Sequence, residues 1–460
     1  MARFTKTQFI GMSICTTASN LTSIEDVSVD GYYAGLLDDH RDLAARVAAI
    51  KNFIEESYRT GKVDTSDSTL KVFVIPEFFM RGVLGAYYNT WVYPMEGILL
   101  QEMRKALNEL ISKGLRINDT CLFVLGTILS TCSPIFPNDE PTKSLYNTGD
   151  NLLDVYYRLH SKALSSNDAN VGTENNVSLG DYLKAIDEAE NLPNENMLCS
   201  SGASEVSFNA PDNAYIDLLM KTLNYCDTQA DVEVTNRCLI MTGSANPLGE
   251  ESSDLVIKQP YGAYVVQKQF KSKEDFILNN KDNNKLTNAP KYIQTIVKYP
   301  DVGNANGDKK KYDEDGLALF EYGGVKIGVD ICLDHSRQRL VKHLYNNPND
   351  RTDIQIITAC GMSVRPNAVI SRKGGYVFNC DGEYTLNDKT AGYDGIFSHT
   401  TLRRIDESIV ITDKVVSKNA QLANALAPTI KRCNLAPVPE KEKLFRFFEY
   451  DVHVYPEVPL

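Results

Sequence analysis

Short apolar, β-branched runs recur along this chain, separated by amphipathic stretches, and this alternation constrains the fold more than any other feature. The runs occupy residues 71–75, 121–126, 238–241, 261–266, 317–322, 325–331, 353–359 and 376–379. A run of four to eight successive apolar residues is typical of a strand that is buried on both faces of a sheet. The sequence therefore predicts a sheet core built from many short strands.

The stretches between the runs carry the helical period. Residues 37–57 place Leu43, Val47, Ile50 and Ile54 on one face, which predicts an amphipathic helix. Residues 96–113 repeat the pattern with Leu99, Met103, Leu107 and Leu110, and Gly114 is a plausible stop. A further helical stretch, with Leu340 and Leu344 on one face, lies between two of the strands. Strands that alternate with helices indicate a layered α/β fold.

Two polar segments interrupt the alternation. Residues 133–215 are rich in Asn, Ser, Asp and Glu, and residues 278–315 in Asn, Lys and Asp. Neither segment offers enough apolar residues for a core of its own, so both are interpreted as insertions into one domain that spans residues 1–460.

Charge and cysteine usage narrow the classes of function. The 460-residue chain has a net charge of −12 and a pI of about 5.1, which disfavours binding to a phosphate backbone. No apolar run approaches the roughly 20 residues of a membrane span, and the N-terminal segment is predicted to be a first strand and not a signal peptide. The ten cysteines form no C-x-x-C pair, which argues against a zinc ribbon. We expect a cytoplasmic protein without metal or organic cofactor.

Three chemically capable side chains follow predicted strands. Cys332 ends the run VKIGVDI and precedes a helical stretch, where free backbone N–H groups would lower the pKa of the thiol. Glu77 follows KVFVI between apolar neighbours, as a buried general base would. Lys268 follows YGAYVV, and Lys271 and Lys273 come soon after. Taken singly, a buried structural cysteine, a solvated acid and surface lysines explain these residues better.

Together and in this order, the three motifs resemble those of the nitrilase superfamily of carbon–nitrogen hydrolases. The matching segments are VIPEFF around Glu77, VVQKQF around Lys268 and GVDICLD around Cys332. The resemblance also extends to EVTNRCLIMTG at 233–243 and DIQIITACGM at 353–362. It leaves out most of residues 133–231 and 277–316, which are the two insertions. It implies an α-β-β-α sandwich that assembles into a homodimer or larger.

The chain departs from the family pattern at three places. Leu333 stands where an aromatic residue usually follows the cysteine, and the four residues from His335 to Gln338 replace an Arg-Phe-Pro-Glu stretch. After Lys268 the chain continues with Gln-Phe where His-Leu is usual, so Lys271 is kept as the alternative lysine. Glu274 is the nearest match to a second active-site acid that many amidases of the family carry.

The resemblance implies hydrolysis of a small amide, or less favourably a nitrile, through a thioester on Cys332. Glu77 would act as the base, and Lys268 with the backbone N–H of Leu333 would stabilise the oxyanion. Three alternatives stay open: an inactive binding or regulatory protein on this fold, an N-acyltransferase, and a Cys–His scheme with His335 as base.

Overall fold

The structure is a computed structural model of the whole chain. It describes residues 3–17, 35, 39–82, 86–88, 95–132, 233–244, 264–270, 277–280, 285–288, 295–296, 318–383, 398–435, 444–445 and 449–460. The chain divides into two compact units, and nearly all described residues belong to the first, which comprises Met1–Asn89, Pro94–Thr131 and Val234–Leu460. The second unit, Thr90–Tyr93 and Cys132–Glu233, contains the predicted insertion at 133–231.

The larger sheet of the first unit has ten strands among the described residues, in the order β18-β19-β1-β2-β4-β5-β6 with β20, β3 and β9 paired beside this path. The strands are β1 (Lys6–Ser13), β2 (Thr69–Val74), β3 (Tyr87–Tyr88), β4 (Cys121–Cys132), β5 (Glu233–Thr242), β6 (Tyr264–Gln267), β9 (Thr295–Ile296), β18 (Thr429–Asn434), β19 (Glu449–Val454) and β20 (Val458–Pro459). β1, β2 and β4 run parallel, and β19 and β6 join antiparallel. The side chains of β2 are all buried, as its apolar run predicts.

The second sheet has the order β10-β11-β12-β13-β14-β17 among the described residues. Its strands are β10 (Leu319–Tyr322), β11 (Val325–Ile331), β12 (Ile354–Ala359), β13 (Tyr376–Asp381), β14 (Thr401–Glu407) and β17 (Gln421–Leu422). β11, β12 and β13 are parallel, so their carboxyl ends meet at one edge. Two hairpins complete the described strands, β7 (Ile277–Asn280) with β8 (Lys285–Asn288) and β15 (Val410–Thr412) with β16 (Val415–Lys418).

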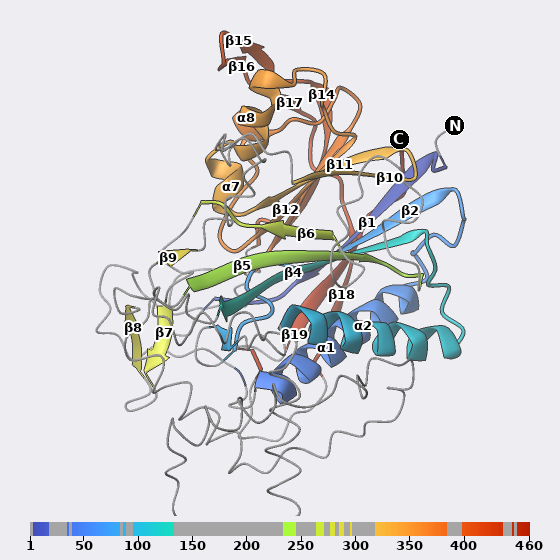
Figure 1. Cartoon of the computed structure of the whole chain (residues 1–460). Helices are drawn as coiled ribbons and strands as arrows, with labels where there is room; N and C mark the ends of the chain where they lie inside the picture. The colour runs from blue at the N-terminus through green and yellow to red at the C-terminus, as the bar shows by residue number, and fades with distance from the viewer. Residues whose placement is uncertain are drawn as a thin grey trace, which may run out of the picture. The chain divides into compact units, whose positions relative to one another are not determined.

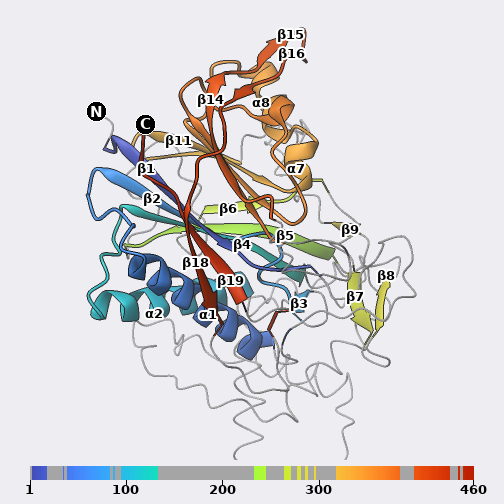
Figure 2. The ribbon, with the colours of Figure 1, turned by 180° about the vertical axis from the view of Figure 1, so that it is seen from behind.

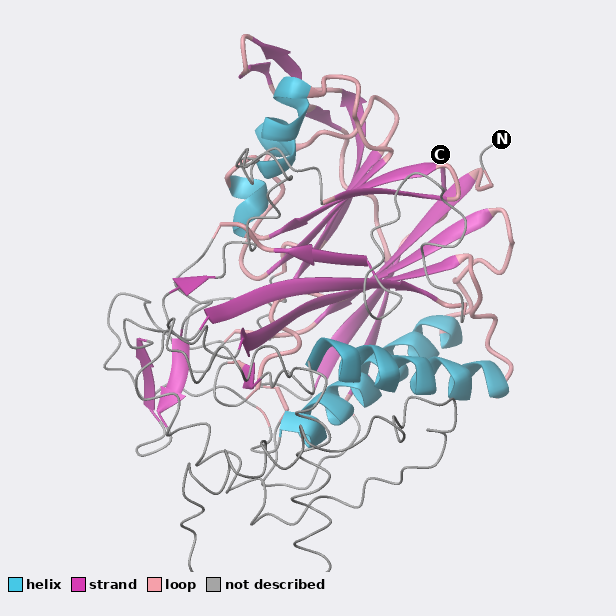
Figure 3. Ribbon diagram, viewed as in Figure 1, coloured by secondary structure: helices cyan, strands magenta, loops and turns pink. Residues whose placement is uncertain are grey.

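Helices cover the outer faces of the sheets. α1 (Asp39–Arg59) and α2 (Met95–Ser112) lie side by side against the larger sheet (Figures 1 and 3). α7 (Leu333–Ser336) and α8 (Arg339–Asn346) follow β11, and the Leu340 side chain of α8 packs over Gly328 of β11. α2 ends just before Gly114, whose φ of 88° is the left-handed conformation expected of a helix stop.

Two hydrophobic cores result from the alternation of side chains along each strand. In β2, Phe73 joins the core under α1 and α2, whereas Val72 and Val74 face the second sheet. The sheets approach closely where β1 crosses β13, because a Cβ at Gly11 would lie 2.8 Å from the Phe378 ring. Figure 2 shows β18 and β19 beside β1 from behind. The predicted α-β-β-α layering is confirmed.

None of the helices in the described ranges is both long and apolar enough to cross a membrane.

Candidate active site

The three predicted site residues come together where strands of both sheets end. Glu77 follows β2, Lys268 follows β6 and Cys332 follows β11. The Lys268 Nζ lies 2.8 Å from Glu77 Oε1, and both side chains are fully buried. The Cys332 thiol contacts the Glu77 carboxylate, whose charge and hydrogen bonding act on the pKa of the thiol. Lys268 and Cys332, which lie 191 or more positions after Glu77 in the sequence, thus form one cluster with it.

Backbone contacts between the sheets place Glu77. Its N–H donates to the carbonyl of Ala359 at the end of β12, and the N–H of Phe78 donates to the Thr127 side chain. Gly126 of β4 makes room for this turn, because its φ is 67° and a Cβ there would lie 2.2 Å from the carbonyl oxygen of Pro76. The carboxylate is therefore fixed at the junction of the two sheets.

Asn236 of β5 supports both members of the ion pair. Its side-chain Nδ2 donates to Glu77 Oε1 over 3.0 Å, and its carbonyl accepts the N–H of Lys268. Asn236 was not among the site residues predicted from the sequence. The available signal was an amide side chain within a strand, since a buried polar group needs a hydrogen-bond partner.

Cys332 occupies a strained turn between β11 and α7. Its φ of 42° is rare for a residue with a side chain, and its N–H donates to Thr358 of β12. The Sγ lies 3.9 Å from the carbonyl oxygen of Cys360. α7 begins at Leu333, so the N–H of Leu333 is one of those with no acceptor inside the helix.

The pKa of the Cys332 thiol is raised well above its ordinary value. Burial is the largest cause and the negative charge of Glu77 the second, and these outweigh the opposite effect of Lys268. The expectation of a lowered thiol pKa is therefore wrong for the resting site. The resting thiol is therefore protonated and lies beside the Glu77 carboxylate.

His335 is held in a separate network. Its Nε2 accepts the N–H of Arg365 over 3.0 Å, so Nδ1 carries the ring proton and donates to Asp330 Oδ2. Gln355 also donates to this carboxylate. With both ring nitrogens engaged and the side chain buried, His335 fixes α7 and the following loop, and the geometry does not favour the Cys–His alternative.

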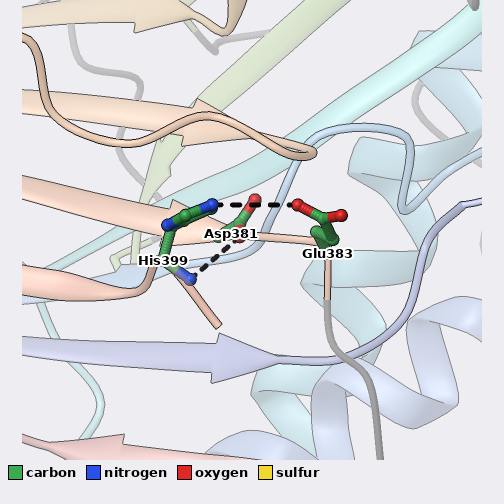
Figure 4. Close-up of side chains that lie close together, drawn as sticks. All are labelled: Asp381, Glu383 and His399. Carbon is green, nitrogen blue, oxygen red and sulfur yellow. Dashed lines mark hydrogen bonds and ion pairs between the residues drawn. The ribbon is translucent and has the colours of Figure 1, made fainter. Parts of the chain in front are cut away.

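Asp381, Glu383 and His399 form a polar cluster beside the strand ends (Figure 4), where their ligand atoms all lie within 4.8 Å of one another. The Asp381 carboxylate accepts the backbone N–H groups of Gly361 and His399. Because Gly361 follows Cys360, the carboxyl group of Asp381 fixes the loop whose carbonyl contacts the Cys332 thiol. The cluster is thus explained by backbone hydrogen bonding.

Lys271, the alternative lysine, and Glu274, the possible second acid, lie outside the described residues.

The likeness of this chain to known proteins lies among solved structures. No family model matches the chain, and no curated protein matches it. Among solved structures, the chain is similar to the crystal structure of Saccharomyces cerevisiae Nit3, a member of branch 10 of the nitrilase superfamily. The two are 10% identical with a TM-score of 0.33, over 91% of this chain and 88% of that one.

Proposed function

We propose that this protein hydrolyses a non-peptide carbon–nitrogen bond, with Cys332 as nucleophile, Glu77 as general base and Lys268 as the cation that stabilises the oxyanion. One observation carries the proposal. A fully buried carboxylate–ammonium pair, 2.8 Å apart, adjoins a thiol in a strained turn at the meeting edge of two sheets. Buried charges are costly, and such an arrangement is typical of sites that perform acid–base and nucleophilic chemistry.

The first step is acylation of the thiol. Glu77 accepts the proton of the Cys332 thiol, and the sulfur forms a bond to the carbonyl carbon of an amide. The electron pair of the carbonyl moves to oxygen, where the Lys268 ammonium and the N–H of Leu333 offer positive partners. Collapse of this intermediate breaks the carbon–nitrogen bond, and the protonated Glu77 returns its proton to the leaving amine. A thioester on Cys332 remains.

The second step is hydrolysis of that thioester. Glu77, again a carboxylate, accepts a proton from a water molecule as the water oxygen attacks the acyl carbon. The carbon–sulfur bond breaks, the acid leaves, and the proton on Glu77 passes to the sulfur. The net reaction consumes one water molecule and produces one acid and one amine or ammonia. The chemistry requires no oxidant and no further reactant.

An amide is the preferred substrate class, and a nitrile is the second. This preference comes from the resemblance to the carbon–nitrogen hydrolases and agrees with a site that provides one base, one cation and one backbone donor for an oxyanion. We also propose a homodimer or larger assembly on the same basis, which light scattering of the purified chain would test.

Intact-mass spectrometry tests the proposal. The wild-type protein and Cys332→Ala are incubated with a panel of small amides and nitriles, and the mass added to the protein is measured after rapid acid quench. Cys360→Ala is the matched control, because Cys360 is adjacent and equally buried (8% exposed against 9%). We expect an acyl adduct on the wild type and on Cys360→Ala, and none on Cys332→Ala.

Two outcomes would redirect the proposal. An adduct that persists in Cys332→Ala would place the nucleophile elsewhere, and no adduct or turnover with any compound would favour an inactive binding protein on this fold. Hydroxylamine, added as a competing acceptor, separates hydrolysis from acyl transfer. If product forms only when an amine acceptor is present, the protein is an N-acyltransferase.

A further inference from the structure

A second buried acid–base pair lies next to the proposed catalytic residues. Asp334 is two residues beyond Cys332, and Arg339 begins α8; the side-chain exposures are 0% and 2%. The Arg339 Nη1 lies 3.1 Å from Asp334 Oδ2. The hydrolytic steps above make no use of either residue. A buried ion pair beside a reactive thiol therefore needs another explanation.

Both members of the pair bind the backbone around Lys268. Asp334 Oδ1 accepts the N–H of Gln269 over 3.0 Å and the N–H of Phe270 over 2.8 Å. Arg339 Nη1 donates to the carbonyl of Gln267 over 2.8 Å. The residues immediately before and after Lys268 are thus held by side chains that follow the nucleophile.

We propose that Asp334 and Arg339 are positioning residues, which act through Lys268 by fixing its backbone against the segment that carries Cys332. This inference rests on the proposed function, because it assigns the pair to the distance between the ammonium and the thiol. Among the described residues, the pair links the segment after β11, which carries Cys332, to the segment after β6, which carries Lys268. Asn236 supplies the complementary link within the first sheet, through the N–H of Lys268.

The chemistry of Asp334 suits this task. An ionised carboxylate has only acceptors, so it can bind two backbone N–H groups and a guanidinium at once. An amide at the same position would keep one acceptor oxygen but direct an NH₂ group toward other donors. Burial raises the pKa of Asp334 to about 6, while the charge of Arg339 opposes that rise. The chain thus keeps a carboxylate where an apolar side chain would be easier to bury.

Asp330 provides a matched control. It is also fully buried, lies two residues before Cys332 and is an acid on the same segment. Among the described residues, its carboxylate binds His335 and Gln355, which belong to the second sheet and its helix, and not the backbone on either side of Lys268. Neutralising either acid removes one negative charge near the thiol, but only Asp334→Asn weakens the contacts that hold the backbone beside Lys268.

The experiment measures the pH profile of Cys332 alkylation by iodoacetamide, followed by peptide mass mapping, in the wild type, Asp334→Asn and Asp330→Asn. Removal of a nearby negative charge alone lowers a thiol pKa. Loss of a well-placed Lys268 raises it, because Lys268 lowers the thiol pKa in the intact site. We expect the midpoint to rise by about 0.5 pH unit or more in Asp334→Asn, which is a threefold fall in thiolate fraction, and to stay or fall in Asp330→Asn.

A double-mutant cycle tests whether the effect passes through Lys268. In a Lys268→Met background, Asp334→Asn should shift the alkylation midpoint by no more than Asp330→Asn does. If the upward shift of Asp334→Asn persists without the lysine, or if both acid variants shift the midpoint upward equally, Asp334 does not act as proposed.

Hydrogen exchange separates this inference from the proposed function. The amides of Gln269 and Phe270 should lose at least about tenfold protection in Asp334→Asn and keep it in Asp330→Asn. Unchanged protection would overturn the positioning role even if the protein is a hydrolase. If protection is lost but Cys332 is never acylated, Asp334 holds the backbone beside Lys268 as proposed, and the catalytic assignment is refuted. If Asp334→Asn fails to fold, Asp334→Asn/Arg339→Met, which leaves no buried charge unpaired, takes its place.

Discussion

The Glu77–Lys268 pair gives the most direct test of whether the candidate site holds its charges away from water. Lys268→Met removes one charge and leaves the buried carboxylate with the Asn236 amide but without its cation. At 2.8 Å the pair is worth about 6 kcal/mol at an effective dielectric constant of about 20. Desolvation of both groups offsets part of this, so we expect a loss of about 3–5 kcal/mol in the free energy of unfolding.

Urea unfolding followed by far-UV circular dichroism at neutral pH measures this loss. The double variant Glu77→Gln/Lys268→Met removes both charges and should recover at least half of it, because no unpaired charge remains buried. Lys105→Met is the control. Its partner Glu102 is closer, at 2.6 Å, but the Lys105 side chain is 64% exposed, so the expected loss is under about 1 kcal/mol.

The reasoning is refuted if Lys268→Met costs less than about 1 kcal/mol, or if the double variant is no more stable than the single one. Either result would mean that solvent reaches the pair and that its charges are not held in a dry site.

Three further predictions concern titration. Glu77→Gln should lower the pKa of the Cys332 thiol, because the carboxylate raises it through charge and hydrogen bonding, and should abolish turnover. The pH profile of alkylation measures the first effect and product release the second. If both thiol reactivity and turnover increase, Glu77 is not the base. His335→Gln should reduce the unfolding free energy by about 1–3 kcal/mol but leave the midpoint of Cys332 alkylation unchanged, since His335 binds Asp330 and the N–H of Arg365. Burial lowers the pKa of His453 to about 4, so the unfolded chain binds more protons between pH 4 and 6.5 and stability falls as the pH drops through that window. His453→Gln should flatten this acid limb by up to about 3 kcal/mol in urea unfolding, and an unchanged limb would show that another group causes it.

The parts of the fold that the sequence predicts are those with strong apolar periodicity. The predicted helix at 37–57 is α1 (Asp39–Arg59), and the run at 325–331 coincides with β11. The C-terminal strand β18 was not predicted because its periodicity is weak. In β18, Ile430 is 56% exposed, so its side chains do not alternate between core and solvent as a half-buried strand would.

The sequence predicts which residues form the candidate site and their order along the chain, but not the contacts that they make. Glu77, Lys268 and Cys332 each follow a predicted strand, and their order along the chain, which resembles that of the nitrilase superfamily, singled them out together. The pKa of the thiol could not be predicted, since its direction depends on whether burial and Glu77 outweigh Lys268. Asn236 and Arg339 were not identified for a related reason, since each contacts a residue that is distant along the chain.

The close approach of β1 and β13 has a mechanical consequence for the chemistry. Glu77 and Lys268 follow strands of the larger sheet and Cys332 follows a strand of the second, so a change in the separation of the sheets would move the thiol relative to the carboxylate without separating the ion pair. Gly11 and Phe378 help to set that separation, and Gly11 pairs with Val74 of β2, three residues before Glu77. A larger side chain at Gly11 is therefore expected to push the sheets apart and to move the Cys332 thiol away from Glu77.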